Sequence, residues 1–205
     1  MPYDTLADLE TQNRVVSALR ERNIEVEHVA TRADALARIQ SLIPESASVM
    51  NGSSRTLEEI GFVEYLKSGA HRWNNLHEQI LAESDPAKQG LLRRQSTVSD
   101  YYLGSVHALT ETGEFLVASN TGSQLPHIVY TSANIIFVVG AQKIVPTLAD
   151  AFQRLEEYVV PLEDKNMQQK YGMGTNISKV VIFKYESPMN KRSVRMILVN
   201  EKLGF

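Results

Sequence analysis

The sequence predicts an α/β fold with a mostly parallel sheet, flanking helices and an additional helical segment at the N-terminus. Runs rich in β-branched and aromatic residues alternate with stretches in which apolar residues recur at helical spacing. Gly, Asn or Ser bounds most of these runs, and the most apolar run covers residues 135–139. Alternation of strands with helices favours parallel strand pairing. A chain of 205 residues fits one such domain, residues 1–205, with a substantial core.

The first 43 residues predict a helix, a strand and a second helix. A helix is predicted over about residues 3–22, where acidic residues come early and arginines late, as suits the helix dipole. Residues 24–30 alternate apolar and polar, which predicts a half-buried strand. The second helix opens at Thr31 and ends before Pro44, because the residue before a proline disfavours helical geometry.

The next segment predicts a strand, a loop and helices. Residues 47–50 predict a short strand that runs into the small polar loop 51–54, and a helix begins at Arg55. Residues 74–99 are the most polar part of the chain and predict a long helical stretch with a break at residues 85–86.

The second half predicts a series of strands around one helix. The helix covers residues 146–158, with a proline near its first turn. The last two strands flank a short polar loop, residues 186–192, and are predicted to form a hairpin. The predicted strands are residues 101–108, 114–118, 135–139, 180–184 and 194–199.

Charge and hydropathy exclude several classes of protein. Residues 1–100 carry 11 basic against 15 acidic residues, and residues 101–205 carry 10 against 9, so neither half is basic enough to predict a nucleic-acid-binding surface. The longest apolar run has five residues, whereas a membrane-spanning helix needs about 20. The N-terminus lacks a signal-peptide pattern. We therefore expect a cytoplasmic protein that binds neither nucleic acid nor membrane.

The absence of cysteine excludes several chemistries. Disulfides, thiolate zinc sites, cysteine nucleophiles and cysteine-ligated iron–sulfur clusters all need a residue that the chain lacks. The sequence also contains no His-Glu-x-x-His motif, no EF-hand loop, no G-x-G-x-x-G and no Walker A motif. We therefore expect no metal site and no cofactor.

The loop at residues 51–55 is the first candidate anion site. Backbone N–H groups at a helix start attract anions, and Gly52 lets a ligand approach closely. Asn51, Ser53 and Ser54 add polar groups, and Arg55 adds a positive charge. The alternative is ordinary helix capping, because serine caps helices of every kind.

The turn at residues 111–113 is a candidate catalytic position. Two strand-like runs flank Glu111, Thr112 and Gly113, and a glutamate at a strand end can act as a general base or nucleophile. The alternative is a hairpin turn with a solvated acid.

Three further elements add candidate ligand contacts. Asn120, Gly122 and Ser123 form a polar loop that can offer backbone donors to an anion or simply connect two elements. His127 could act as an acid or base near neutral pH, although a histidine without a visible partner is more often structural. Lys143 follows the most apolar strand, where α/β folds place ligands, and is either an anion partner or a solvated lysine.

Several strings occur along the chain in a defined order. They are NGSSRTLEEIG at residues 51–61, GSVHALTETG at 104–113, VVGAQKIVP at 138–146 and MILVNEKLGF at 196–205. Together they resemble the LUD domain family, the lactate-utilisation proteins, and the last string is similar to a single-domain branch of it. The resemblance extends from about Leu6 to the end of the chain.

The resemblance implies a fold similar to ribose-5-phosphate isomerases, CoA transferases and formyltetrahydrofolate cyclo-ligases, in which strand-end loops often hold anionic ligands. It implies that residues 52–54 line such a site, with residues 111–113 and the loop at 120–123 opposite. Similar single-domain proteins often carry a cysteine-rich stretch before the C-terminal strand. Here that stretch, residues 166–178, contains no cysteine, so a metal or redox role tied to those cysteines does not carry over.

Three functions compete. The resemblance and the lack of cysteine point first to a non-redox accessory or ligand-binding subunit linked to L-lactate utilisation, which binds a small anionic metabolite and leaves electron transfer to iron–sulfur partner subunits. The alternative is an isomerase-, transferase- or cyclo-ligase-like enzyme for a small phosphorylated or carboxylated metabolite, with Glu111 as base or nucleophile. A third is a ligand-binding domain without chemistry. A homodimer is expected only from the frequency of two-fold assemblies.

Overall fold

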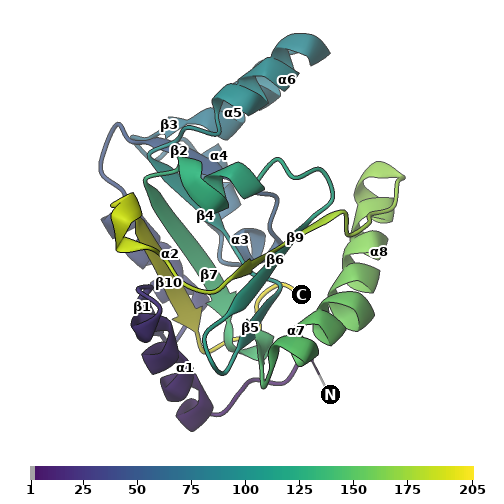
Figure 1. The fold of residues 1–205 in the computed structure, drawn as a ribbon. Helices are drawn as coiled ribbons and strands as arrows, with labels where there is room; N and C mark the ends of the chain where they lie inside the picture. Colours follow the sequence, from purple (N-terminus) through teal and green to yellow (C-terminus); the bar gives the residue numbers. More distant parts are fainter. Residues whose placement is uncertain (1–2) are drawn as a thin grey trace.

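A computed structural model describes residues 3–205, which contain two β-sheets and their covering helices (Figure 1). The larger sheet, sheet A, has six strands, and every neighbouring pair is parallel. This arrangement confirms the predicted α/β class with its parallel sheet. In spatial order, sheet A consists of β1 (Glu25–Val29), β10 (Ser193–Val199), β7 (Asn134–Gly140), β4 (Tyr101–Gly104), β2 (Ser48–Asn51) and β3 (Asn74–Asn75).

The second sheet, sheet B, was not predicted. Two of its three neighbouring strand pairs are antiparallel, and the third is parallel. The predicted strand at residues 101–108 is divided between the two sheets, because the chain leaves sheet A after Gly104 and enters sheet B at Ala108. In spatial order, sheet B consists of β8 (Ile144–Val145), β5 (Ala108–Thr110), β6 (Phe115–Ser119) and β9 (Lys179–Phe183).

The helices complete a layered arrangement (Figure 1). One face of sheet A packs against α2, α3 and α4, and the other packs against α1 and sheet B. The outer face of sheet B packs against α7 and the π-helical turn that follows it. The helical elements are α1 (Leu9–Glu21), α2 (Arg32–Leu42), α3 (Arg55–Glu59), α4 (Phe62–Lys67), α5 (Leu76–Ala82), α6 (Pro86–Gln95), α7 (Leu148–Arg154), α8 (Val160–Tyr171), the π-helical turns η1 (His127–Thr131) and η3 (Leu155–Val159), and the 3-10 turns η2 (Ala141–Lys143) and η4 (Pro188–Asn190).

Helix starts follow local capping chemistry. The first helix begins at Leu9 rather than near residue 3, because the Asp8 carboxylate accepts a hydrogen bond from the Thr11 backbone N–H at 2.7 Å. At the start of α2, Thr31 and Asp34 bond reciprocally in a capping box.

The core explains why the central strands are so apolar. Successive residues of β7, such as Phe137 and Val138, point to opposite faces of sheet A, and both are fully buried. A strand covered on both faces is apolar along its whole length. The carboxyl end of this strand therefore lies deep in the molecule, and the residues after it are buried as well.

Two sequence predictions are wrong. Strands β9 and β10 do not form a hairpin: β9 pairs with β6 in sheet B, while β10 lies between β1 and β7 in sheet A. The helix predicted over residues 146–158 begins at Leu148 and continues through η3 and α8 to Tyr171. Proline does not end it, because Pro161 falls in the first turn of α8, directly after the π-helical turn.

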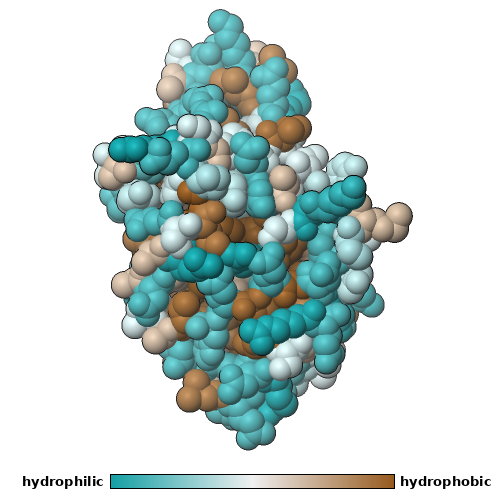
Figure 2. Space-filling model, turned by 90° about the vertical axis from the view of Figure 1, so that its left-hand side faces the viewer, coloured by the Kyte–Doolittle hydropathy of each residue, from teal (hydrophilic) through white to brown (hydrophobic). Residues whose placement is uncertain are grey.

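The predicted long helical stretch consists of α5 and α6, which extend away from the rest of the fold (Figure 1). No residue of α6 is buried. Apolar and hydrophilic residues mix over this tip of the molecule (Figure 2). Within residues 3–205, no helix is both long and apolar enough to span a bilayer.

Candidate functional site

The carboxyl ends of four neighbouring strands of sheet A, β10, β7, β4 and β2, bring the candidate site together. After β2 the chain passes to α3 on one face of the sheet, whereas after β4 it passes to β5 on the other face. Adjacent strands whose connections leave to opposite faces form a topological switch point, where open α/β sheets bind their ligands. The loop at residues 51–54 and Ser105 both follow strands at this point.

Lys143 lies at the centre of this edge. It is only 3% exposed, and its Nζ donates to the Thr56 and Ser105 hydroxyl oxygens at 3.0 and 3.1 Å and to the Val106 carbonyl at 3.1 Å. The ammonium group thus connects the segments that follow β2, β4 and β7. All three acceptors are neutral, so the surroundings satisfy its hydrogen bonds without balancing its charge.

Burial has a large effect on this lysine. Burial, together with repulsion from the Arg154 guanidinium, lowers the pKa of Lys143 from 10.5 to about 7, while Glu59 acts in the opposite direction. A lysine with such a pKa exchanges its proton near neutral pH. Groups of this kind in a strand-end site are candidates for binding or catalysis.

A second buried cation lies close by. Arg154 of α7 is 0% exposed, donates to the His107 carbonyl oxygen, and lies with its guanidinium 5.2 Å from the ring centre of Tyr158. Its Nε has no hydrogen-bond partner among the described residues. Burial lowers its pKa to about 10, so it stays charged at neutral pH. Within residues 3–205, no carboxylate forms an ion pair with Arg154 or with Lys143.

His107 connects the two cations. The carbonyls of Val106 and His107 accept from Lys143 and Arg154 respectively. Burial, followed by the charges of both cations, lowers the pKa of His107 to about 3. Its Nδ1 accepts a hydrogen bond from the Ala118 N–H at 3.1 Å, which assigns the proton of the neutral ring to Nε2. The imidazole therefore offers an N–H donor and no charge.

The loop at residues 51–55 lies at the switch point. Gly52 is tightly packed: a Cβ there would come within 2.4 Å of the Tyr102 hydroxyl and 2.9 Å of the Gln124 side-chain oxygen. Ser53 is exposed, and the Ser54 hydroxyl caps α3 by accepting from the Leu57 N–H at 3.4 Å.

The flanking residues of this loop have their own partners. Arg55 pairs with Glu59 at 3.0 Å and with Glu58 at 3.2 Å. Asn51 is buried and donates to the Gly52 carbonyl at 3.2 Å. The loop therefore adds small polar groups to the edge, while the charge of Arg55 is already balanced by two carboxylates.

The turn at residues 111–113 joins β5 and β6 and packs against α1. Glu111 pairs with Arg14 at 3.2 Å, and Arg22 donates to the Thr112 carbonyl at 2.7 Å. Gly113 has φ +89°, and a Cβ there would lie 3.0 Å from the Ala18 backbone. The structure thus brings these three residues to α1, and none of their described hydrogen bonds reaches the loop at residues 51–55.

The loop at residues 120–123 is followed directly by Gln124. The side-chain oxygen of Gln124 lies close to Gly52 at the switch point. The Gly122 N–H donates to the Ser119 hydroxyl at 2.9 Å, and Ser178 donates to the Asn120 carbonyl. The Ser123 N–H donates to the Thr121 hydroxyl at 3.3 Å. The bonds of Gly122 and Ser123 are local to the loop, while the bond from Ser178 ties the loop to the segment before β9.

His127 is buried away from the other candidates. Its Nδ1 lies 2.9 Å from the Ser132 hydroxyl and 3.3 Å from the Ser99 hydroxyl, and both serines precede strands of sheet A, at its amino edge. The ring stacks on Tyr102 at a centroid distance of 4.6 Å. Burial lowers the pKa of His127 to about 4, so the ring is neutral at pH 7.

Comparison with known proteins adds a family to this geometry. The family model described as "LUD domain" matches residues 13–202. The chain belongs to the LUD domain family. No curated protein matches it. Among solved structures, it is similar to a DUF162 family protein from Deinococcus radiodurans, at 12% identity and a TM-score of 0.55 over 96% of this chain and 100% of that one. At that identity the similarity shows the fold alone.

Three residues of the site in this LUD domain were missed by sequence reasoning: Ser105, His107 and Arg154. Ser105 and His107 lay inside a predicted strand, although the small pair Gly104-Ser105 is a signal for its end. Arg154 had a clearer signal, because it follows Ala151 by three positions on the apolar face of its helix.

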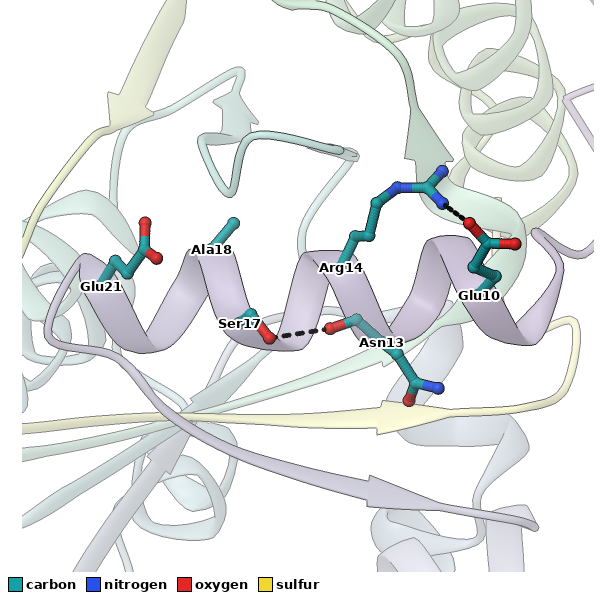
Figure 3. Close-up of a pocket in the computed structure, with 6 residues that line it drawn as sticks. All are labelled: Glu10, Asn13, Arg14, Ser17, Ala18 and Glu21. Carbon is teal, nitrogen blue, oxygen red and sulfur yellow. Dashed lines mark hydrogen bonds and ion pairs between the residues drawn. The ribbon is translucent and has the colours of Figure 1, made fainter.

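The LUD domain also has a shallow surface hollow on α1 (Figure 3). Arg14 pairs there with Glu10 at 3.0 Å as well as with Glu111. One helix supplies the whole lining, so the hollow is a surface feature beside the turn at residues 111–113. No group of three or more His, Asp or Glu in residues 3–205 is arranged to hold a metal ion. The hollow is lined by Glu10, Asn13, Arg14, Ser17, Ala18 and Glu21.

Proposed function

We propose that this LUD-domain protein binds a small anionic metabolite at the carboxyl edge of sheet A, as a non-redox accessory subunit linked to L-lactate utilisation. The observation that carries the binding site is the pair of buried cations, Lys143 and Arg154, for which residues 3–205 supply no ion-paired carboxylate. Buried charges are normally paired, so an uncompensated pair favours a ligand of opposite charge.

The contacts of Lys143 favour the same ligand. A carboxylate or phosphate oxygen that replaces the neutral Ser105 hydroxyl as acceptor would add the attraction between opposite charges to the hydrogen bond of the ammonium group. An anion also favours the protonated lysine, so binding would take up a proton above pH 7. We expect affinity to fall about tenfold for each pH unit above 7.

The link to L-lactate utilisation rests on membership of the LUD domain family. The chain has no cysteine, so thiolate-ligated iron–sulfur clusters would belong to partner subunits. The alternative of an independent enzyme with Glu111 as base gains no support from the contacts of that residue, which pairs with Arg14 on α1.

Calorimetric titration with L-lactate, inorganic phosphate and related anions at pH 6, 7, 8 and 9 tests the binding site. Lys143→Met is expected to abolish the binding, whereas the matched control Lys88→Met, at an exposed position of α6, should bind as the wild type does. Binding that is unchanged by Lys143→Met would refute the site. Affinity purification from the native host tests the accessory role, and recovery without an iron–sulfur subunit would contradict it.

A further inference from the structure

The hydroxyl of Ser105 lies against a buried amine. Ser105 directly follows β4 at the switch point of sheet A, and its Oγ is 3.1 Å from Lys143 Nζ. A serine within hydrogen-bond distance of a base is the arrangement that activates a hydroxyl for nucleophilic attack, and lysine can take the role of the base. This pair is independent of Glu111, the residue that the sequence suggested for chemistry.

Accessibility separates Ser105 from the other hydroxyl on Lys143. Thr56 is 1% exposed and lies under the C-terminal segment, where it donates to the Leu203 carbonyl at 3.3 Å. Ser105 is partly exposed. Of the two hydroxyls on Lys143, Ser105 is therefore the one that is open to solvent in part, while Thr56 acts only as a second support for the amine.

The charged neighbours of Lys143 favour its neutral form. Arg154 from α7 lowers its pKa, Glu59 from α3 raises it, and burial dominates, so that the pKa is about 7. His107, another residue of the site, has its pKa lowered to about 3, so it is neutral and does not compete for the proton. About half of the molecules then hold a neutral amine at pH 7, which can accept a proton from a hydroxyl.

The Ser105 hydroxyl can change partner with the protonation state of Lys143. In the structure it donates to the Val138 carbonyl at 2.7 Å and accepts from Lys143. When the amine is neutral, rotation about the Cβ–Oγ bond directs the same hydrogen to Nζ, because the two oxygen-to-partner distances are both within hydrogen-bond range. No movement of the backbone is needed.

We propose that Ser105 and Lys143 form a nucleophile–base pair that accepts the acyl group of a carboxylic ester. The Ser105 oxygen bonds to the ester carbonyl carbon while its proton passes to Lys143 Nζ. The bond from that carbon to the alkoxy oxygen then breaks with its electron pair, and Lys143 returns the proton to the leaving alkoxide. Water reverses the sequence on the acyl-serine and releases the acid. This activity goes beyond anion binding and does not depend on it.

A neutral alkyl fluorophosphonate tests the pair without requiring an anion site. It forms an oxygen–phosphorus bond to an activated serine and releases fluoride. We expect one adduct per chain by intact-mass measurement, located on Ser105 by peptide mapping. The labelling rate should rise with pH to a plateau, with its midpoint near 7. Ser105→Ala should lose the adduct, and Lys143→Met should label at least about 100-fold more slowly, the usual lower range for a general base.

The control is Ser84→Ala, which removes an exposed serine outside the site and should label as the wild type does. Circular dichroism melting checks the folding of each variant. If Lys143→Met does not fold, the wild-type pH profile decides: a rate proportional to hydroxide from pH 6 to 10 would overturn the proposal. An adduct elsewhere, or none, would also overturn it. Anion titration of the wild type is unaffected by these outcomes, so failure of this pair and failure of the anion site can be told apart.

Discussion

Replacing the buried Lys143 with methionine is expected to remove a gain in stability that the wild-type protein shows between pH 7 and pH 9. The folded-state pKa of Lys143 is lowered from 10.5 to about 7. Between these values the unfolded chain binds a proton that the folded protein does not bind, so the free energy of unfolding rises with pH. Below pH 7 both states are protonated, and the full cost of the buried charge is present.

The magnitude follows from the size of the shift. Each pKa unit corresponds to 1.36 kcal/mol, so the buried charge costs about 5 kcal/mol below pH 7. At pH 7 Lys143 is only partly protonated in the folded protein. Between pH 7 and pH 9 the free energy of unfolding of the wild type therefore rises by about 2 kcal/mol through this group. Lys143→Met has no proton to lose, so its free energy of unfolding lacks this rise. Any difference between the hydrogen bonds of the protonated and the neutral amine is already contained in the shifted pKa.

Urea unfolding followed by circular dichroism, at pH 7 and pH 9 in buffers without phosphate or carboxylates, measures the effect. The quantity of interest is the wild-type minus variant difference at each pH, because other titrating groups contribute equally to both proteins. The exposed Lys88→Met serves as control and should show a difference that is constant with pH. The wild-type minus variant difference for Lys143→Met is expected to rise from pH 7 to pH 9. If it stays constant, or falls, burial does not depress this pKa.

Two other substitutions test the packing at the carboxyl edge and the role of the hairpin turn. Gly140→Ala is expected to destabilise the protein by about 1–3 kcal/mol in urea unfolding, because the added Cβ would lie 2.7 Å from the Glu201 carbonyl oxygen; Gly90→Ala, with open space on an exposed helix, should instead stabilise it by up to about 1 kcal/mol. Glu111→Gln removes a partly exposed ion pair with Arg14, so thermal unfolding should show a loss of at most about 1 kcal/mol, and anion titration should give the wild-type affinity. A large loss of stability or of anion binding in Glu111→Gln would assign that residue a role beyond its ion pair.

Local patterns in the sequence predicted most elements, because capping and periodicity act over a few residues. The break at Pro86, the strand of residues 135–139 and the loop at residues 51–54 all follow from such short-range signals. The assignment of strands to two sheets does not follow from such short-range signals. Nothing local distinguishes β9 from β10, since both are short apolar runs; their partners lie far away in the sequence.

The candidate site also has a part that the local sequence predicts and a part that depends on long-range contacts. Lys143 could be singled out because it follows the most apolar strand, and such positions lie at a ligand-binding edge. Its burial could not be predicted, because it depends on three segments that converge from separate strands. The burial of Arg154 depends on α7, which packs over sheet B, and the sequence did not predict that sheet. Long-range contacts, rather than residue type, decide which of the polar residues share a site.

The position of β10 has a consequence for how the molecule assembles. β1 forms its pairs with β10, and β10 joins it to β7. During synthesis β1 is made more than 160 residues before β10 (residues 25–29 against 193–199), so the first strand lacks its neighbour in the sheet while that length of chain is added. Closure of such a distant pair is entropically costly and slow. We therefore expect α1 and β1 to be exposed to chaperones until β10 has been made and can join the sheet.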